Sequence, residues 1–535
     1  MKRAATTLAV SLAISTIVMA CASMQPGGRD LVTRAVSAQG GADALTAVKT
    51  VSYKATVRQW DPEQSASAGG EMRHGNDSTL VSVTDVATGA TRNDWVRNYH
   101  YPAPRSFTYS EIVTAQAGYV AGIDSNGRTK QSREANPPAH SMSSLRLTTA
   151  QRELLRESPL LALEMSKNPD RVTPASSVTI GGVSHPAVNY RAGEQTLTVL
   201  FDPTTGLPAR VRSLDYDNIW GDVTYDVVLA DWQTVGSARV AMSRKYELNG
   251  RTVTEVKLSE ATVNTPIAAD QLAIPEPFLA AARKPAVGQV PYQWIIRRQF
   301  IGVYLDSEQP SYDTQSGPGL RLQELAPGIQ HVVGGSHNSL IVEMKDHVIV
   351  FDAPVSDWQS TWTISAARGK YVRKPVKYLV LTHHHMDHAG GLRAYADAGA
   401  TIVTGPDTAA HFRRVLAAPF TRNPVLSASD LTRTPIVEVA GGKHVLSDGT
   451  RQVELYVLDP NPHADGLLIG YVPDAKLGFV TDIWSPGAGP LPDKPNPALA
   501  ALIAGVKKAG ISPEKFAGGH GTNADYAPLA ALEGK

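Results

Sequence analysis

The sequence predicts an α+β protein of two domains, the first mostly antiparallel β and half-barrel-like, the second built of layered strands and helices. Its 535 residues exceed what one ordinary core supports. Up to about residue 285, β-branched and aromatic runs end at turn residues, whereas beyond residue 320 short apolar strands alternate with helical stretches. We therefore expect a β-rich domain at 30–285, a Pro/Gly-rich connector at 286–320 and a second domain at 321–535.

Turn residues and one proline mark the elements of the first domain. The pair Asn249-Gly250 predicts a two-residue hairpin turn, because both residue types accept the positive φ angles that such a turn needs. The segment "DPTTGLP" at 202–208 predicts another turn. An amphipathic helix is expected from Thr148, with an interruption at Pro159 because proline breaks the helical hydrogen-bond pattern.

The overall charge excludes one class of partner. The net charge is +1, and no block of Lys and Arg occurs anywhere in the chain. Phosphate binding depends on clustered basic residues, so we expect no nucleic-acid partner. A hydrophobic content of 42% with 19% charged residues is typical of a folded globular protein.

The first residues are interpreted as an export signal at 1–21. Lys2 and Arg3 form a positive end, the stretch 8–18 is apolar, and small residues follow. The apolar stretch is shorter than the roughly 20 residues that a membrane-spanning helix needs. We therefore expect a secreted protein whose signal is processed, followed by a short linker at 22–29.

Cys21 is the only cysteine of the chain and ends the segment "VMAC". This segment resembles the bacterial lipobox, in which the cysteine is lipidated and anchors the protein to a membrane. The residues after it, Ala22 and Ser23, lack the acidic side chain associated with inner-membrane retention. We expect a periplasmic protein of a Gram-negative bacterium, anchored to the outer membrane through Cys21; a soluble protein cleaved at Ala20-x-Ala22 is the alternative.

Four histidines surround one aspartate in "LTHHHMDHAGGL", directly after the apolar strand "VKYLVL". Strand ends are where α/β proteins present ligands and catalytic groups. The alternation lets His383 and His385 face one metal, with Asp387 and His388 offset towards a second position and His384 pointing away. Imidazole with carboxylate, and no thiolate, suits zinc, manganese or iron. A solvent-exposed histidine tract would need neither the buried strand before it nor the Gly-Gly helix start after it.

Further donors follow downstream, again where strands end in loops. Eleven of the fifteen histidines lie after residue 330. His463 follows the strand "QVELYVL", Asp482 follows "LGFV" and His520 lies between glycines in "FAGGHG". Taken singly each residue is more often structural, but their order and context predict two metal positions.

These motifs resemble the metallo-β-lactamase-fold hydrolase superfamily over roughly residues 320–535. The H-x-H-x-D-H block is followed by a histidine, an acidic residue and a last histidine, after 75, 19 and 38 residues. The resemblance implies an αββα sandwich that binds two Zn²⁺ ions, or Mn or Fe. It implies that the first metal takes His383, His385 and His463, that the second takes Asp387, His388 and His520, and that Asp482 bridges both.

The resemblance also implies roles for residues around the metals. Asp387 would orient the nucleophile and act in catalysis. Asp352 matches an acidic residue that holds the histidine loop by hydrogen bonds, and Asn338 matches a polar residue near the mouth of the site. The aromatic residues Phe412 and Phe420 are better explained as core residues than as a substrate-binding wall.

We therefore expect an exported dinuclear-metal hydrolase that uses a metal-bridging hydroxide to cleave an ester, lactone, thioester or phosphoester of a small molecule. A β-lactamase is one alternative, although such enzymes usually carry cysteine or serine near the position of Asp482. An iron-dependent oxidase or sulfur dioxygenase on the same fold is another. A third is a lipid-binding lipoprotein, because 30–275 resembles periplasmic lipoprotein-carrier domains; that half is either an acyl-binding groove or a scaffold for the second domain.

Overall fold

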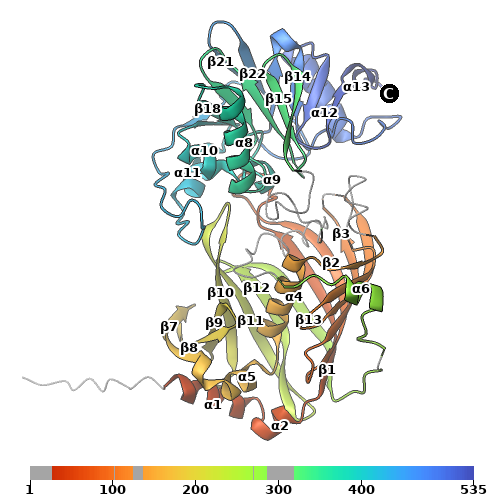
Figure 1. Cartoon of the computed structure of the whole chain (residues 1–535), viewed down its shortest axis with the longest axis vertical. Helices are drawn as coiled ribbons and strands as arrows, with labels where there is room; N and C mark the ends of the chain where they lie inside the picture. Colours follow the sequence, from red (N-terminus) through yellow and green to blue (C-terminus); the bar gives the residue numbers. More distant parts are fainter. Residues whose placement is uncertain are drawn as a thin grey trace, which may run out of the picture.

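The computed structural model describes residues 27–101, 103–124, 137–268, 270–285, 306, 319–335 and 337–535. The predicted signal and Cys21 lie outside these residues. Two domains are stacked along the long axis of the molecule, with the N-terminal domain at the bottom of Figure 1 and the C-terminal domain above it. Among the described residues, no helix combines the length and the apolar character that crossing a bilayer would require.

The N-terminal domain is one large antiparallel sheet, as the sequence predicts. Its thirteen described strands follow the order β6-β5-β4-β3-β2-β1-β13-β12-β11-β10-β9-β8-β7, so that each strand pairs with a neighbour in sequence except where β1 meets β13. The strands are β1 (Thr50–Asp61), β2 (Arg73–Asp85), β3 (Thr91–Tyr99), β4 (Arg105–Val113), β5 (Gly118–Gly122), β6 (Ala139–Ser141), β7 (Val172–Ile180), β8 (Val183–Ala192), β9 (Gln195–Phe201), β10 (Pro208–Asp217), β11 (Gly221–Val235), β12 (Ala238–Leu248) and β13 (Arg251–Val263).

Both predicted turns are present. Asn249 and Gly250 join β12 to β13 with φ angles of 48° and 78°, the left-handed conformation that the residue pair was expected to supply. The segment 202–208 joins β9 to β10. These turns explain why consecutive strands of this half pair with one another.

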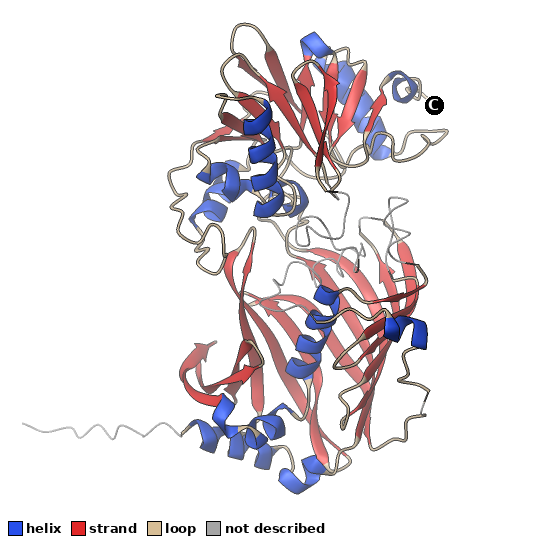
Figure 2. Cartoon of the chain, in the orientation of Figure 1, coloured by secondary structure: helices blue, strands red, loops and turns tan. Residues whose placement is uncertain are grey.

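The predicted helix is divided by its proline into α4 (Ser144–Glu157) and α5 (Leu161–Lys167). It begins four residues earlier than expected, because Ser143 caps it by accepting a hydrogen bond from the backbone N–H of Arg146. In Figure 2, α4 lies against the curved sheet. The domain also contains α1 (Gly28–Ala38), α2 (Ala42–Thr46) and α6 (Glu276–Ala280), and α1 begins inside the segment expected as a linker at 22–29.

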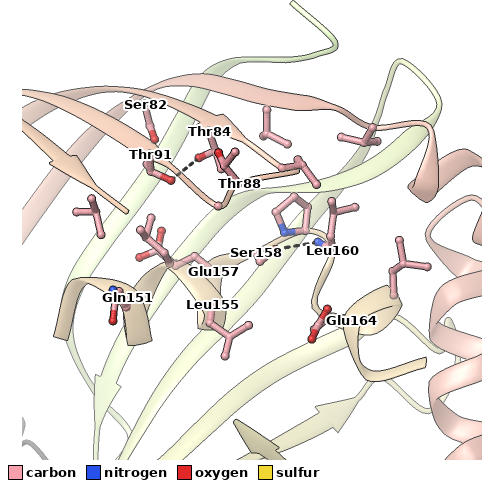
Figure 3. Close-up of a pocket in the computed structure, with 18 of the residues that line it drawn as sticks. Ser82, Thr84, Thr88, Thr91, Gln151, Leu155, Glu157, Ser158, Leu160 and Glu164 are labelled. Carbon is pink, nitrogen blue, oxygen red and sulfur yellow. Dashed lines mark hydrogen bonds between the residues drawn. The ribbon is translucent and has the colours of Figure 1, made fainter. Parts of the chain in front are cut away.

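A cavity of about 590 Å³ lies between the sheet and the helices of this domain (Figure 3). Its wall is partly apolar, with Val51 and Leu160, and partly charged, with Glu157 and Arg244. The Arg244 guanidinium pairs with the Glu157 carboxylate at 2.6 Å. The domain thus has room for a ligand, and it also contacts the second domain. Its structure is therefore compatible with an acyl-binding groove and with a scaffold for the second domain.

A buried arginine fixes α4 to the sheet. Arg146 is 1% exposed, and its guanidinium pairs with Asp124 at 2.5 Å, with Glu111 at 2.6 Å and with Asp306. Buried charges are tolerated only when they are paired and hydrogen-bonded. Without this arginine, the carboxylates would remain buried with less positive charge around them.

We predict that Arg146→Met lowers the free energy of unfolding of the N-terminal domain by about 3–5 kcal/mol, since it removes the buried guanidinium that three carboxylates share. Urea unfolding of the full chain, followed by circular dichroism, measures the effect. Arg29→Met is the matched control, because Arg29 makes only an exposed ion pair with Asp170 at 3.8 Å. An unchanged urea midpoint for Arg146→Met would contradict the role given to this residue.

The C-terminal domain is the αββα sandwich that the resemblance implied. One sheet has the order β14-β15-β16-β17-β18-β19-β20 and the other β21-β22-β23-β24-β25-β26. The strands are β14 (Arg321–Ala326), β15 (Ile329–Val333), β16 (Ser339–Glu343), β17 (Val348–Phe351), β18 (Val376–Val380), β19 (Thr401–Thr404), β20 (Ile436–Glu438), β21 (Lys443–Ser447), β22 (Gln452–Val457), β23 (Leu468–Val472), β24 (Leu477–Val480), β25 (Lys515–Gly518) and β26 (Asn523–Asp525).

Helices cover the outer faces of both sheets. A core that includes Phe351 and Phe479 fills the space between the sheets. Phe412 and Phe420 pack in the core under the helices of the first sheet, as expected of core residues. The helices are α8 (Asp357–Lys370), α9 (Met386–Ala389), α10 (Leu392–Asp397) and α11 (Ala409–Ala417) beside the first sheet, and α12 (Pro497–Ala509) and α13 (Ala527–Ala530) beside the second.

The turn between β10 and β11 attaches the N-terminal domain to the C-terminal domain. Asn218 donates a side-chain hydrogen bond to the Val355 carbonyl at 2.7 Å, and its own carbonyl accepts one from the buried Arg393 guanidinium at 2.5 Å. Asp222 accepts hydrogen bonds from the backbone N–H groups of Thr421 and Arg422. These contacts hold the two domains in one relative orientation, which places the loops of the first against the strand ends of the second.

Candidate metal centre

The seven donors predicted from the sequence lie together at one edge of the sandwich. They follow four strands or lie on one short helix. The buried strand β18 leads into His383 and His385, and α9 carries Asp387 and His388. The remaining donors follow strands of the second sheet: His463 comes after β22, Asp482 after β24 and His520 after β25.

Three imidazole nitrogens meet at the first position. His463 Nε2 lies 3.2 Å from His383 Nε2 and 3.0 Å from His385 Nδ1. The other ring nitrogen of His385 donates to the carbonyl of Ser65 at 2.8 Å, so Nδ1 faces the cluster as a lone pair. Converging lone pairs repel one another unless a cation lies between them, and this position therefore has the chemistry of a metal site.

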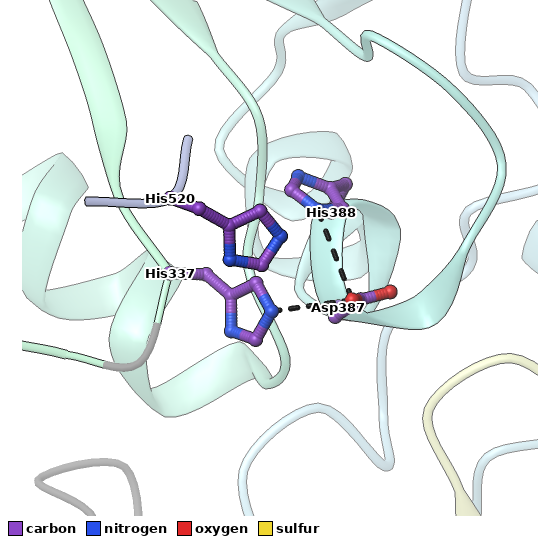
Figure 4. Close-up of side chains that lie close together, drawn as sticks. All are labelled: His337, Asp387, His388 and His520. Carbon is purple, nitrogen blue, oxygen red and sulfur yellow. Dashed lines mark hydrogen bonds and ion pairs between the residues drawn. The ribbon is translucent and has the colours of Figure 1, made fainter. Parts of the chain in front are cut away.

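The second position is formed by His337, Asp387, His388 and His520 (Figure 4), whose ligand atoms lie within 4.8 Å of one another. His388 Nδ1 donates to Asp352 at 2.9 Å, which turns Nε2 towards the cluster. Asp387 Oδ2 lies 3.2 Å from His337 Nε2 and 3.8 Å from His388 Nε2.

Asp482 lies between the two positions. Its Oδ2 atom is 3.4 Å from His383 Nε2 and 2.9 Å from His388 Nε2, and its Oδ1 atom is 2.8 Å from His520 Nε2. One carboxylate therefore contacts donors of both groups. This is the placement expected of a ligand shared by two metals.

Burial determines the protonation state of the first group. It lowers the pKa of the His383 and His385 imidazoles well below the usual value, and neighbouring histidines lower it further. Burial likewise lowers the pKa of His463. All three rings are therefore neutral at pH 7, which is the form that binds metal.

The second group combines ionised carboxylates with one imidazole, His388, whose pKa they raise. Burial would raise the pKa of Asp387 and Asp482, but nearby histidines hold both well below the usual value. For His388, burial would lower the pKa, but Asp482, Asp387 and Asp352 raise it well above the usual value. These carboxylates therefore favour positive charge at the second group.

Comparison with known proteins agrees with this geometry. Residues 332–520 match the family model described as the metallo-beta-lactamase superfamily. The C-terminal domain belongs to the metallo-beta-lactamase superfamily. The chain thus contains a domain of this superfamily, as the resemblance of its motifs implied, together with a large additional N-terminal domain.

Solved structures similar to this metallo-beta-lactamase domain have low sequence identity, and no curated protein matches the chain. The FIM-1 metallo-beta-lactamase of Pseudomonas aeruginosa in its mono-zinc form is 19% identical, covering 40% of this chain and 94% of its own, with a TM-score of 0.30. A metallo-beta-lactamase from Pontibacter korlensis is 20% identical over 40% and 100%, with a TM-score of 0.30. The sec-alkylsulfatase Pisa1 of Pseudomonas sp. is 15% identical over 40% of each chain, with a TM-score of 0.30.

Asp352 orders the histidine loop of the metallo-beta-lactamase domain in the way the sequence predicts. Its carboxylate accepts hydrogen bonds from the N–H and the hydroxyl of Thr382, at 2.8 and 3.0 Å, in addition to the one from His388. The glycines after the histidines are needed for close packing, because a Cβ on Gly391 would lie 1.9 Å from Ser360 Oγ. Both features fix the direction in which the imidazoles point.

Asn338 does not lie at the mouth of the site, so that prediction is wrong. Its side chain is buried and donates to the carbonyls of Gly518 and Gly521, at 3.0 and 2.9 Å, which fixes the loop carrying His520. The neighbouring His337 faces the second group instead, and sequence analysis did not single it out. The signal for it was its place in "GGSHNSL", between two glycines and a buried strand.

The N-terminal domain also reaches the site, which sequence analysis did not predict. The Gln64 side chain donates to Asp387 Oδ1 at 2.8 Å. The Ser65 carbonyl accepts hydrogen bonds from His385 and from His384, at 2.8 and 3.0 Å. His384 therefore points away from the metal donors, as its position in the motif suggested.

A buried histidine forms a hydrogen bond to the loop that carries His520. His331, on β15, donates from Nε2 to the Gly518 carbonyl at 2.9 Å, and burial lowers its pKa to about 4. In the unfolded chain the pKa of a histidine is about 6.5. Between pH 6.5 and 4 the unfolded state therefore binds a proton that the folded state does not, and this favours unfolding.

We predict that His331→Gln flattens the dependence of stability on pH between 6.5 and 4. In the wild type the neutral His331 contributes its full stability above pH 6.5 and loses up to about 3 kcal/mol as the pH falls through 4. Urea unfolding of both proteins at pH 7, 5.5 and 4.5 measures the difference. Parallel pH profiles for the two proteins would contradict the prediction.

Proposed function

We propose that the C-terminal domain carries a dinuclear metal centre and hydrolyses an ester, lactone, thioester or phosphoester of a small molecule. The observation that carries the proposal is the convergence of two donor groups on the shared carboxylate of Asp482. In this proposal His383, His385 and His463 would hold the first metal, Asp387, His388 and His520 would hold the second, and Asp482 would be shared by both.

Zinc fits these donors best. Neutral imidazole and carboxylate ligands favour it, with manganese or iron as alternatives, and the C-terminal domain contains no cysteine to change that preference. Two such ions would supply a hydroxide at neutral pH by lowering the pKa of water from 15.7 towards 7, and would polarise the bond to be cleaved.

The residues of the chain have distinct tasks around the ions. Asp482 would link the two positions, because its Oδ2 atom faces both His383 and His388 while its Oδ1 atom faces His520. Asp387 is ionised at neutral pH, so it would accept a hydrogen bond from the attacking hydroxide and orient it. The same carboxylate can pass the proton that it receives to the leaving group. Asp352 keeps His388 turned towards the site through the hydrogen bond that its carboxylate accepts.

The bridging carboxylate also separates this proposal from its alternatives. Enzymes that cleave β-lactams usually have cysteine or serine near this position, whereas Asp482 contacts both donor groups. A purely lipid-binding protein has no use for seven converging donors. The N-terminal cavity remains compatible with a ligand of its own, but it is lined by residues of the first domain alone.

We predict that the purified full chain hydrolyses at least one member of a panel of p-nitrophenyl esters, thioesters, lactones and p-nitrophenyl phosphoesters, and leaves nitrocefin intact. Chelation should abolish turnover and added zinc should restore it. His385→Ala should lose metal and most of the hydrolysis, because it removes a nitrogen donor.

His444→Ala is the matched control, since His444 is a histidine of β21 outside both donor groups. Metal content by mass spectrometry and initial rates are measured for all three proteins. Full metal content with unchanged turnover in His385→Ala would refute the assignment of this ligand. Nitrocefin turnover would favour the β-lactamase alternative, and oxygen consumption with bound iron would favour an oxidase.

We also propose that the chain is exported to the periplasm and anchored to the outer membrane by a lipid on Cys21. The proposal is supported by the charged and apolar pattern of residues 1–21 and by the "VMAC" segment. Expression in a Gram-negative host with labelled palmitate should give a labelled protein in the outer-membrane fraction. Cys21→Ala should carry no label, because no other thiol is present; a soluble, unlabelled wild type would refute the anchor.

A further inference from the structure

The loop between β1 and β2, residues 62–72, crosses from the N-terminal domain to the metal centre. Gln64 and Ser65 are 5% and 3% exposed. The Ala66 carbonyl accepts a hydrogen bond from the backbone N–H of Asp465, two residues beyond His463. The loop therefore touches both the α9 segment and the loop that carries His463.

The two carboxylate oxygens of Asp387 face different partners, and Gln64 binds one of them. Its side-chain NH₂ donates to Oδ1 at 2.8 Å, while Oδ2 faces His337 and His388 at 3.2 and 3.8 Å. The amide hydrogen bond therefore engages Oδ1. The other oxygen is thereby directed towards the second metal position.

Tyr101 orients the amide of Gln64. Its hydroxyl donates to Gln64 Oε1 at 2.7 Å, which leaves the NH₂ group on the side of Asp387. The Arg73 guanidinium lies 4.3 Å from the centre of the Tyr101 ring and packs on it. Tyr101, Gln64 and Asp387 thus form a chain of hydrogen bonds that runs from one domain into the metal centre of the other.

The same loop orients a ligand of the first position. The Ser65 carbonyl accepts a hydrogen bond from Nε2 of His385, and so determines that Nδ1 carries the lone pair. This contact comes from the backbone and does not depend on the serine side chain. The Gln64 contact, by contrast, can be removed by substitution.

We propose that Gln64 is a positioning residue for Asp387, oriented by Tyr101, so that metal binding at the second position depends on the N-terminal domain. The inference rests on the proposed function, since it concerns the same two metal positions. It assigns the N-terminal domain a part in the metal centre that neither an acyl-binding groove nor a passive scaffold would have.

The experiment measures the affinities of both metal equivalents in the full chain by competition with a zinc chelator, and their spectra after substitution with Co²⁺. Groups that hydrogen-bond to metal ligands typically contribute 10–100-fold to metal affinity. Gln64→Leu, which keeps the volume but not the amide, should weaken the second equivalent by about 10-fold and leave the first unchanged. Tyr101→Phe, a milder change that keeps the ring under Arg73, should weaken it in the same direction.

The double variant tests whether Tyr101 acts through Gln64. If it does, Gln64→Leu with Tyr101→Phe binds the second equivalent no more weakly than Gln64→Leu alone, because effects in one chain of contacts are not additive. Ser67→Ala is the matched control from the same loop, since Ser67 is exposed and its side chain lies outside the donor groups. It should keep both wild-type affinities.

Wild-type affinities in both Gln64→Leu and Tyr101→Phe would overturn the inference. Equal weakening of both equivalents would also overturn it, because general loosening of the domain contact does not select one position. A wild type that binds two ions but hydrolyses nothing refutes the proposed function and leaves the inference standing. A wild type that binds only one ion refutes both.

Discussion

The chemistry of the metal centre depends on imidazoles and carboxylates that are buried together, away from water. His383, His385 and His388 have no solvent exposure, and the carboxylates of Asp387 and Asp482 lie among them. Removing such groups from water costs several kcal/mol each unless charge and lone pairs are compensated. The protein compensates them partly by itself: burial keeps the first group of rings neutral, and the carboxylates favour a proton on His388. Metal ions bound at this position would add positive charge where the lone pairs meet.

The rest of the fold holds these groups together. The donors come from different strands and loops, so each needs its own support: Asp352 orients His388, Asn338 fixes the loop of His520 and the Ser65 carbonyl orients His385. Strands that end at one edge of the sandwich bring the donors near one another. Hydrogen bonds from neighbouring segments then decide which nitrogen or oxygen faces the centre, and loss of such a contact typically costs about 10–100-fold in metal affinity.

How much of this could be predicted follows from how local each feature is. The H-x-H-x-D-H block, and the donors at the ends of later strands, are visible because a strand followed by a donor is a short-range pattern. Tyr101, Gln64 and Ser65 carry no such pattern, since the contact from Gln64 to Asp387 joins residues 323 positions apart. Asn338 was misplaced because sequence alone does not show which way an amide next to a strand points; its neighbour His337 faces the cluster instead. The N-terminal sheet was predictable from turns such as Asn249-Gly250, whereas its docking onto the second domain was not.

The contact between the domains bears on how such a chain selects its substrate. Metal ligands determine which bond can be cleaved, but they say little about the rest of the molecule that carries it. In this chain one wall of the centre is contributed by Gln64 and Ser65, with Tyr101 hydrogen-bonded to Gln64, and all three belong to a different domain and a different part of the sequence. The turn that holds Asn218 against Val355 is a further contact between the same two domains. Two proteins with the same metallo-beta-lactamase domain but different N-terminal domains would therefore present different walls to a substrate, so that similarity of the ligand set alone does not transfer substrate preference from one to the other.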